Sequence, residues 1–209
     1  MIRATPRGKV ARRAAVALTV VVCVIACVAC GPNPLVRAGP ATAVGSIALE
    51  TPVDWSRYGD PRVELWTRDG TLLNQLQFVG GVEPGQHVFR SRRETKRRPD
   101  GPYFRAGMNG LELQALVLDG LIELGAVRPA ARRLRPVRFG QDADDGRGES
   151  VRFDIDTANQ DGLLYRGLAQ TSVRRGKLYV MLFLAPAEHY FERDRGIVER
   201  MLDSARPLD

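Results

Sequence analysis

The sequence predicts an α+β fold in which helices flank an antiparallel sheet, and three observations support this class. Residues 46–79 and 150–185 contain short segments in which apolar and polar residues alternate, as in half-buried strands. Dipeptides that favour tight turns, such as Asp69-Gly70 and Asp161-Gly162, connect several of these segments. Two longer segments carry apolar residues at helical spacing. Tight turns make neighbouring strands antiparallel, and helices that pack on such a sheet define the class.

Three strands are expected in the first part of the domain. Residues 46–51 and 62–67 both alternate apolar and polar side chains, so each strand should turn one face toward a core. Asp69-Gly70 then provides a hairpin turn, after which residues 71–79 supply the returning strand. This region therefore predicts one strand followed by a hairpin.

The second part of the domain predicts an antiparallel meander. Its first strand should be half-buried, because three apolar residues alternate with three charged ones: Val151, Phe153 and Ile155 with Arg152, Asp154 and Asp156. Turns at Asp161-Gly162 and Arg175-Gly176 bound the next strand, residues 163–174. Residues 177–185 (KLYVMLFLA) are almost continuously apolar, so this strand should be central and covered on both faces.

Two helices complete the expected fold. Residues 109–124 are apolar at many positions and precede Gly125, a residue suited to a helix C-terminus. Residues 187–205 form a more clearly amphipathic helix, which Pro207 should terminate. Its apolar face contains Phe191, Val198, Met201, Leu202 and Ala205. Its polar face contains Glu192, Arg193, Arg195, Glu199, Arg200 and Asp203.

The N-terminal segment accounts for most of the positive charge of this 209-residue chain. Lys and Arg outnumber Asp and Glu by 31 to 24, a formal net charge of +7. Residues 1–29 hold five of the basic residues and no acidic one, so the remainder has 26 basic and 24 acidic residues and a net charge of +2. A basic stretch followed by an apolar run of 16 residues at 14–29 is typical of a secretory signal peptide, because a spanning helix needs about 20.

All three cysteines, Cys23, Cys27 and Cys30, lie in or next to this apolar run, which excludes a cysteine-based site from the rest of the sequence. A cysteine at the end of an apolar run, after small residues, resembles the lipobox of bacterial lipoproteins, in which the cysteine is diacylated and becomes the mature N-terminus. Cys30 is the expected lipidation site because the apolar run stops there. Cys27 is the alternative because its upstream residues fit the pattern better. An uncleaved anchor and an ordinary signal peptide are the other interpretations.

The lipoprotein resemblance implies a domain organisation and a location. Residues 1–29 would be the signal peptide, residues 30–45 the lipidated N-terminus with a flexible Pro/Gly/Ala-rich tether, and residues 46–209 a single α+β domain. A tether of about fifteen residues would allow up to about 50 Å between the domain and the bilayer. The protein would be exported and lipid-anchored, at the outer membrane facing the periplasm in a Gram-negative host, since no Asp follows either cysteine.

The last third of the chain resembles PsbP-like domains. It shows, in order, Gly176-Lys177-Leu178-Tyr179, an apolar strand, Ala185-Pro186-Ala187-Glu188, the aromatic pair Tyr190-Phe191, and a helix that ends in residues 201–206. The opening IALETPVDW, residues 47–55, is also similar, so the resemblance covers about residues 46–79 and 150–206. It implies an α/β/α sandwich and a non-enzymatic module that binds or stabilises other macromolecules, with no catalytic residues to transfer.

A basic segment stands out in the part of the chain that the resemblance does not cover. Residues 90–98 (RSRRETKRR) contain six basic side chains: Arg90, Arg92, Arg93, Lys96, Arg97 and Arg98. They fall within a stretch from Gly80 to Gly107 that predicts a loop of about 27 residues, a length that is usually functional or disordered. We expect this loop to bind anions, which would be lipid headgroups, an acidic polymer or an acidic protein face. The alternative is a solvated loop without function.

Nucleic acid is not an expected partner, because export removes the protein from it and no aromatic residues interleave the basic segment. No metal or cofactor is expected either. Two groups of acids lack the spacing of a calcium loop: Asp142, Asp144, Asp145 and Glu149, and then Asp154, Asp156 and Asp161.

Catalytic residues are not predicted. The two histidines, His87 and His189, lie about a hundred residues apart, and the sequence has no Gly-x-Ser-x-Gly elbow. Trp55 and Trp66 are expected in the core rather than on a sugar-binding surface. The predicted function is a membrane-anchored, non-enzymatic binding or assembly module of the bacterial cell envelope. The alternative is a hydrolase that acts on envelope material with either histidine as general base.

Overall fold

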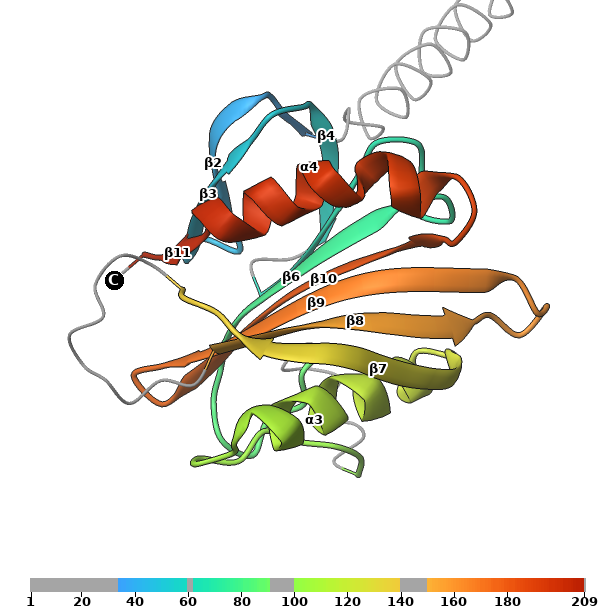
Figure 1. Ribbon diagram of the computed structural model, residues 1–209. Coiled ribbons are helices and arrows are strands. Elements are labelled where there is room, and N and C mark those ends of the chain that lie inside the picture. Colours follow the sequence, from blue (N-terminus) through green and yellow to red (C-terminus); the bar gives the residue numbers. More distant parts are fainter. Residues whose placement is uncertain (1–33, 60–61, 91–99, 140–149, 209) are drawn as a thin grey trace, which may run out of the picture. The chain divides into compact units, whose positions relative to one another are not determined.

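The computed structural model describes residues 34–59, 62–90, 100–139 and 150–208, which belong to one compact unit (Figure 1). Its helices are α3 (Gly110–Glu123) and α4 (Tyr190–Ser204). Its strands are β1 (Leu35–Val36), β2 (Gly39–Ala43), β3 (Ile47–Thr51), β4 (Trp55–Gly59), β5 (Val63–Thr67), β6 (Gln75–Val82), β7 (Val127–Pro136), β8 (Ser150–Ala158), β9 (Leu164–Arg174), β10 (Lys177–Pro186) and β11 (Arg206–Pro207).

An eight-stranded antiparallel sheet organises the unit, in the order β1-β4-β5-β6-β10-β9-β8-β7. Strand β10 lies inside the sheet between β6 and β9, and its residues 180–185 are all buried. This confirms the central, doubly covered strand that the apolar run predicts. A smaller sheet of β11, β3 and β2 lies against α4, which contacts β3.

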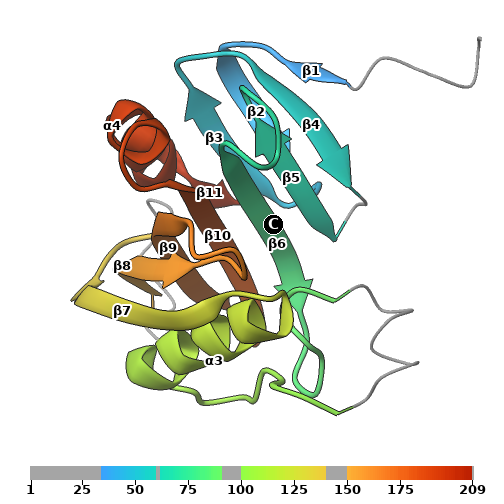
Figure 2. The same cartoon turned by 90° about the vertical axis from the view of Figure 1, so that its right-hand side faces the viewer.

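The two helices pack on opposite faces of the large sheet (Figures 1 and 2). Side chains of β10 alternate between the two faces: Met181 and Phe183 join the apolar cluster of α4, and Val180 and Leu182 join that of α3. Each helix thereby buries its apolar stripe, which is the main force that holds it on the sheet. The predicted α+β class, with an antiparallel sheet and two helices, is confirmed.

The segment expected to be a flexible tether contains two strands, so the predicted boundaries of the tether, residues 30–45, are wrong for residues 35–43. Strand β1 pairs with β4, and β2 pairs with β3. Small residues explain the error, because the GPATA of β2 gives little apolar alternation although Ala43 is fully buried. The folded domain therefore begins before residue 46.

Strand β8 is covered on both faces, whereas its alternation predicts a solvent-exposed charged face. Phe153 and Ile155 pack on the α3 side, as expected. Arg152 is buried on the α4 side, where its Nε and Nη2 donate to Oε1 of Gln170 at 2.9 and 2.6 Å. Its Nη1 lies 2.8 Å from Oδ1 of Asp203. The burial of this charge is tolerated because partners surround the guanidinium.

Strands β4 and β7 are not predicted by the alternation pattern, and other boundaries differ by a few residues. Strand β7 (VRPAARRLRP) hides its pattern because its register shifts twice along β8. Strand β6 begins at Gln75 rather than at residue 71, since residues 71–73 form the turn. Helix α4 begins at Tyr190, three residues after the predicted start.

Candidate binding surface

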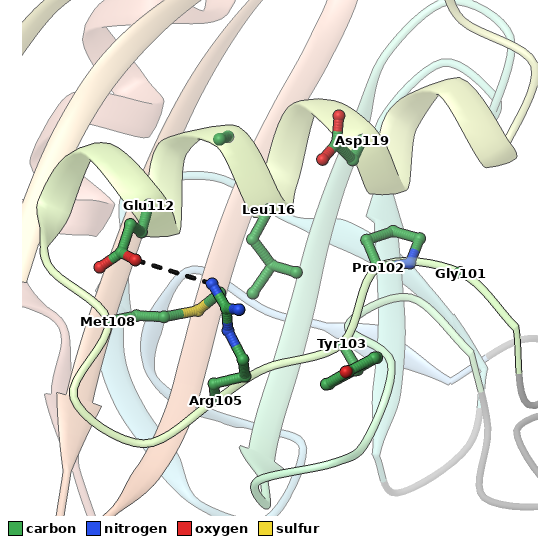
Figure 3. Close-up of a pocket in the computed structure, with 9 residues that line it drawn as sticks. Gly101, Pro102, Tyr103, Arg105, Met108, Glu112, Leu116 and Asp119 are labelled. Atoms are coloured by element: carbon green, nitrogen blue, oxygen red, sulfur yellow. Dashed lines mark ion pairs between the residues drawn. The ribbon is translucent and has the colours of Figure 1, made fainter.

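A groove of about 300 Å³ lies between α3 and the segment that precedes it (Figure 3). Its floor is apolar, because Leu116 is buried and Met108 packs against the same cluster. Exposed Tyr103 and Arg105 lie on one side, and Glu112 and Asp119 of α3 lie on the other. Gly101, Pro102 and Ala115 complete the lining. An apolar floor with an aromatic ring and charges of both signs suits a segment of a partner protein.

The start of α3 positions the acidic side of this groove. Oδ1 of Asn109 accepts hydrogen bonds from the backbone amides of Leu111 (3.0 Å) and Glu112 (3.1 Å), and Oε2 of Glu112 accepts from the amide of Asn109 at 2.8 Å. This reciprocal capping box fixes the side chain of Glu112. Its other oxygen lies 3.6 Å from Nη2 of Arg105. The Asn-x-x-Glu spacing is the one sequence signal that points to this place.

The region predicted as a loop of about 27 residues is largely ordered around the groove. The amide of Phe104 donates to the carbonyl of Gln86 at 2.9 Å, and the amide of Gly85 donates to the carbonyl of Phe104 at 2.8 Å. Val88 and Phe104 are buried in the cluster of α3. Between β6, which ends at Val82, and α3, which begins at Gly110, the described residues form no helix or strand. The predicted long loop is therefore confirmed there, except that residues 80–82 belong to β6, and residues 91–99 lie outside the described part.

Arg90, the first residue of the basic segment 90–98, is held in place by contacts with Glu123 and Asp100. Its Nη2 lies 2.8 Å from Oε1 of Glu123 at the end of α3, and its Nη1 donates to the carbonyl of Asp100 at 2.9 Å. Gly101 passes beside this pair with a φ of +124°, and a Cβ there would collide with Oε1 of Glu123. Arg90, with a side chain only 14% exposed, therefore acts as a structural clamp rather than as part of an exposed anion site.

Most of the other predicted site residues lie outside the described residues. They are Cys27, Cys30, Arg92, Arg93, Lys96, Arg97 and Arg98, and the roles expected for them stay predictions. The acids Asp142, Asp144, Asp145 and Glu149, for which no site is predicted, also lie outside the described residues. Trp55 and Trp66 are described, and both are buried in the core as expected.

The two histidines occupy different environments, and neither lines the groove. His87 is 2% exposed, and its carbonyl accepts a hydrogen bond from Nη2 of Arg62 at 2.9 Å. His189 is exposed just before α4, where its ring stands edge-on to Tyr190 with 5.0 Å between centroids. A general base must reach its substrate, and the burial of His87 prevents that in this conformation.

The acids of β8 and the following turn are used in ion pairs or exposed. Asp154 lies 3.2 Å from Nη1 of Arg133, and Asp156 pairs with Arg132. Asp161 is exposed in the turn before β9. Within the described ranges, no group of three or more His, Cys, Asp or Glu side chains is placed to hold a metal ion.

A buried ion-pair network joins α4 to the turn between β5 and β6. Asp194 is fully buried, and its Oδ1 accepts from Arg68 at 2.5 Å and from Nε of Arg193 at 2.9 Å. Its Oδ2 accepts from Asn74 at 2.8 Å and from Nη2 of Arg193 at 2.7 Å. Because donors of the protein occupy both oxygens, this carboxylate fixes α4 in place and is not available for chemistry.

Arg193 also links this network to Asp69. Its hydrogen bond lowers the pKa of the Asp69 carboxyl below the usual range, and a bond from Asn74 adds to this, while partial burial opposes it. The bonds to Asp194 and Asp69 in turn raise the pKa of Arg193 above its ordinary value. Asp69 and Arg193 therefore both stay charged at physiological pH.

Strand β7, at one edge of the sheet, carries a second group of basic residues that sequence alternation does not reveal. Arg128, Arg132 and Arg133 are exposed there. Arg128 and Arg133 have positive φ values of 48° and 57°, next to the two register shifts with β8. Charges and bulges on an edge strand oppose its pairing with another chain.

No protein-family model and no curated protein matches this chain. Among solved structures, the chain is similar to the solution structure of cyanobacterial PsbP (CyanoP) from Synechocystis sp. PCC 6803. The TM-score is 0.52 at 13% identity, over 86% of this chain and 95% of that chain. The domain has a PsbP-like fold.

This PsbP-like likeness establishes how the chain is arranged and transfers no residue roles, because the identity is only 13%. A protein from Bacteroides thetaiotaomicron VPI-5482 aligns with a TM-score of 0.41 and 10% identity over 83% of this chain and 50% of that chain. No helix in the described part of the PsbP-like domain is both long and apolar enough to cross a membrane.

Proposed function

We propose that this chain is a non-enzymatic binding or assembly module of the bacterial cell envelope, held at a membrane by acyl chains on Cys30. The groove beside α3 carries the proposal, because its apolar floor and charged sides suit a segment of a partner protein. The basic residues 92–98 precede the groove in sequence and favour a partner with an acidic face.

The lipid anchor rests on the sequence. Each methylene of an acyl chain buried in the bilayer contributes about 0.8 kcal/mol, so two or more palmitate-like chains hold a domain stably. In a Gram-negative host, the absence of Asp after the cysteine favours the outer membrane and a domain in the periplasm. The PsbP-like fold supports a module that binds other macromolecules, as the resemblance implies, rather than a hydrolase.

Site-specific photo-cross-linking in intact envelopes tests the groove. A photoreactive residue replaces Ala115, which is exposed and lines the groove, and a control replaces exposed Arg200 on α4. We expect a discrete cross-linked product from position 115 and none from position 200. The same products from both positions, or none from either, would contradict the proposal. A product that survives protease digestion would identify an acidic polymer in place of a protein.

A charge variant tests the basic segment separately. Changing Arg92, Arg93, Lys96, Arg97 and Arg98 to Ser, while Arg90 keeps its clamp, should weaken partner capture at low salt. The matched control changes the four arginines of this set to Lys, which preserves the charge and should preserve capture. Equal capture by the Ser variant would remove the basic segment from the binding surface.

Palmitate labelling tests the anchor. Cys30→Ala should abolish labelling and membrane retention, whereas Cys27→Ala should retain both. The mass of the mature N-terminal peptide decides between the two cysteines. Labelling that persists in Cys30→Ala and is lost in Cys27→Ala would assign the anchor to Cys27.

A further inference from the structure

We infer that the anchored edge of the sheet, defined as β1, β4 and β5, lies against the lipid bilayer, with the side of Leu35 and Tyr58 turned toward the headgroups. The inference rests on the lipid anchor proposed above. It assigns a surface and an orientation that the anchor alone does not specify.

The folded unit holds the chain firmly from Pro34 onward. The carbonyl of Pro34 accepts a hydrogen bond from the amide of Arg57 at 3.0 Å. Leu35 and Val36 then pair with Ser56 and Trp55 of β4. Since Trp55 is buried in the core, Pro34 is fixed to the body of the domain.

The length of chain before Pro34 limits how far the domain stands from the membrane. Pro34 is four positions after Cys30, and at about 3.3–3.6 Å per residue these four steps span at most about 14 Å in any conformation. From Cys27 the limit is about 25 Å. Both limits are well below the 50 Å or so that a tether to residue 45 would allow.

The size of the domain, compared with the length of the tether, determines which side of the domain can reach the bilayer. A domain of this length has a radius of gyration of about 16 Å, which corresponds to a sphere with a radius of roughly 20 Å. A tether shorter than this radius cannot let the far side of the domain reach the bilayer. The anchored edge is therefore the part that meets the lipid, and β7, at the other end of the strand order, is farther away.

The side chains near Pro34 suit this contact. Leu35 is 51% exposed and Tyr58 is 38% exposed. Leu35 stands opposite Ser56, and Ser56 and Tyr58 point to the same side of β4, so the two large side chains share one side of the sheet. Tyrosine is enriched at membrane interfaces, where its ring lies at the headgroup level.

The charged residues that the structure describes near the anchored edge do not oppose the contact. Arg37 is exposed and Arg57 is half-buried, and both carry the sign that anionic headgroups attract. The carboxylate of Asp54 accepts a hydrogen bond from the amide of Ala38 at 2.7 Å. Glu64 accepts from Nε1 of Trp66 at 3.0 Å, on the opposite side of the sheet from Tyr58.

Fluorescence quenching on the lipidated full-length protein tests the orientation. Single cysteines at Leu35 and Tyr58 carry an environment-sensitive dye, and Leu111→Cys on α3 is the matched control because Leu111 is also an exposed leucine, 65% exposed. The protein is inserted in vesicles of phosphatidylethanolamine with a minority of phosphatidylglycerol and quencher-labelled lipid. We expect several-fold stronger quenching at Leu35 and Tyr58 than at Leu111.

A longer tether tests whether the short tether is what brings Leu35 and Tyr58 close to the lipid. Inserting about twelve Gly/Ser residues before Pro34 adds an r.m.s. span of about 19 Å, so quenching at Leu35 and Tyr58 should fall toward that at Leu111. Quenching that persists would support the same surface, held by its own side chains. Equal quenching at all three sites in a lipidated protein of native length would overturn the orientation and leave the anchor intact. A protein without acyl chains and without membrane retention would overturn both.

Discussion

The two faces of the eight-stranded sheet hold their helices by different means. On the α3 face the buried side chains are mostly apolar, and Leu113, Val117 and Leu121 belong to the same apolar cluster as Phe153. On the α4 face an apolar cluster is present too, but buried polar groups accompany it: Asp194, Asn74, Arg152 and Gln170. Hydrophobic contact is non-directional, whereas ion pairs fix one geometry. The fold thus uses shape complementarity under α3 and directional bonds under α4.

The largest expected effect is on the apolar face. Phe153→Ala removes a fully buried ring from the α3 side and should lower the free energy of unfolding by about 3–5 kcal/mol. Urea unfolding followed by circular dichroism measures it as a lower midpoint. Leu111→Ala, an exposed change on the same side, should stay within about 0.5 kcal/mol of the unaltered protein. Equal losses for both variants would contradict a core under α3.

The next effect tests the polar face. Asp194→Ala deprives Arg68, Asn74 and Arg193 of their shared acceptor, and we expect a loss of about 2–4 kcal/mol. Tryptophan fluorescence is the suitable probe, because Trp55 and Trp66 belong to the cluster under α4. Glu192→Ala, also on α4, breaks an exposed ion pair with Arg166 of β9 and should cost less than about 1 kcal/mol. A negligible change in Asp194→Ala would show that apolar contacts alone hold α4.

A smaller loss of stability is expected from changes at the N-termini of the two helices, and it should differ between them. Asn109→Ala removes the capping box of α3 and should cost about 1 kcal/mol. His189, in the corresponding position of α4, makes no capping bond with its side chain, so His189→Ala should change stability by less than about 0.5 kcal/mol. Thermal unfolding of both variants gives the comparison. A larger loss for His189→Ala than for Asn109→Ala would reverse it.

The smallest effect is a pH dependence confined to the α4 side. Because Arg193 lowers the pKa of Asp69 in the folded state, Asp69 adds stability above the ordinary carboxyl pKa of 3.8 and loses it as the pH falls through the lowered value. Asp69→Asn should therefore flatten the loss of stability as the pH falls below the ordinary carboxyl pKa of 3.8. Urea midpoints at neutral and acid pH measure this. An acid loss of stability as steep in Asp69→Asn as in the unaltered protein would contradict this role of Asp69.

Sequence patterns predict this fold best where apolar residues fill a whole strand or one face of a helix. The run KLYVMLFLA shows a strand buried on both faces, and spacing in α4 identifies its apolar stripe. The same reasoning fails at Arg152 and Asp194, whose charge suggests solvent although partners on distant segments bury them. Strand β2 is not predicted by this reasoning, because its small residues show almost no alternation of apolar and polar side chains.

The groove beside α3 is harder to foresee than the fold. Its sides combine Tyr103 and Arg105 from the segment before the helix with Glu112 and Asp119 from the helix itself. No local motif joins these residues, since folding alone brings the two segments together. The basic segment attracts notice in the sequence, yet its first member, Arg90, turns out to clamp the chain.

The two outer strands of the sheet have a consequence for how this protein meets others. Extended peptides often bind by adding a strand to an open edge. Strand β1 has only two residues, and β7 is bulged and lined with arginine, so neither offers a regular ladder of main-chain donors and acceptors. Neighbouring copies of the domain would likewise find no regular backbone template at these two strands. Recognition at either outer strand of the large sheet must therefore depend on side chains, which makes its specificity open to change by single substitutions.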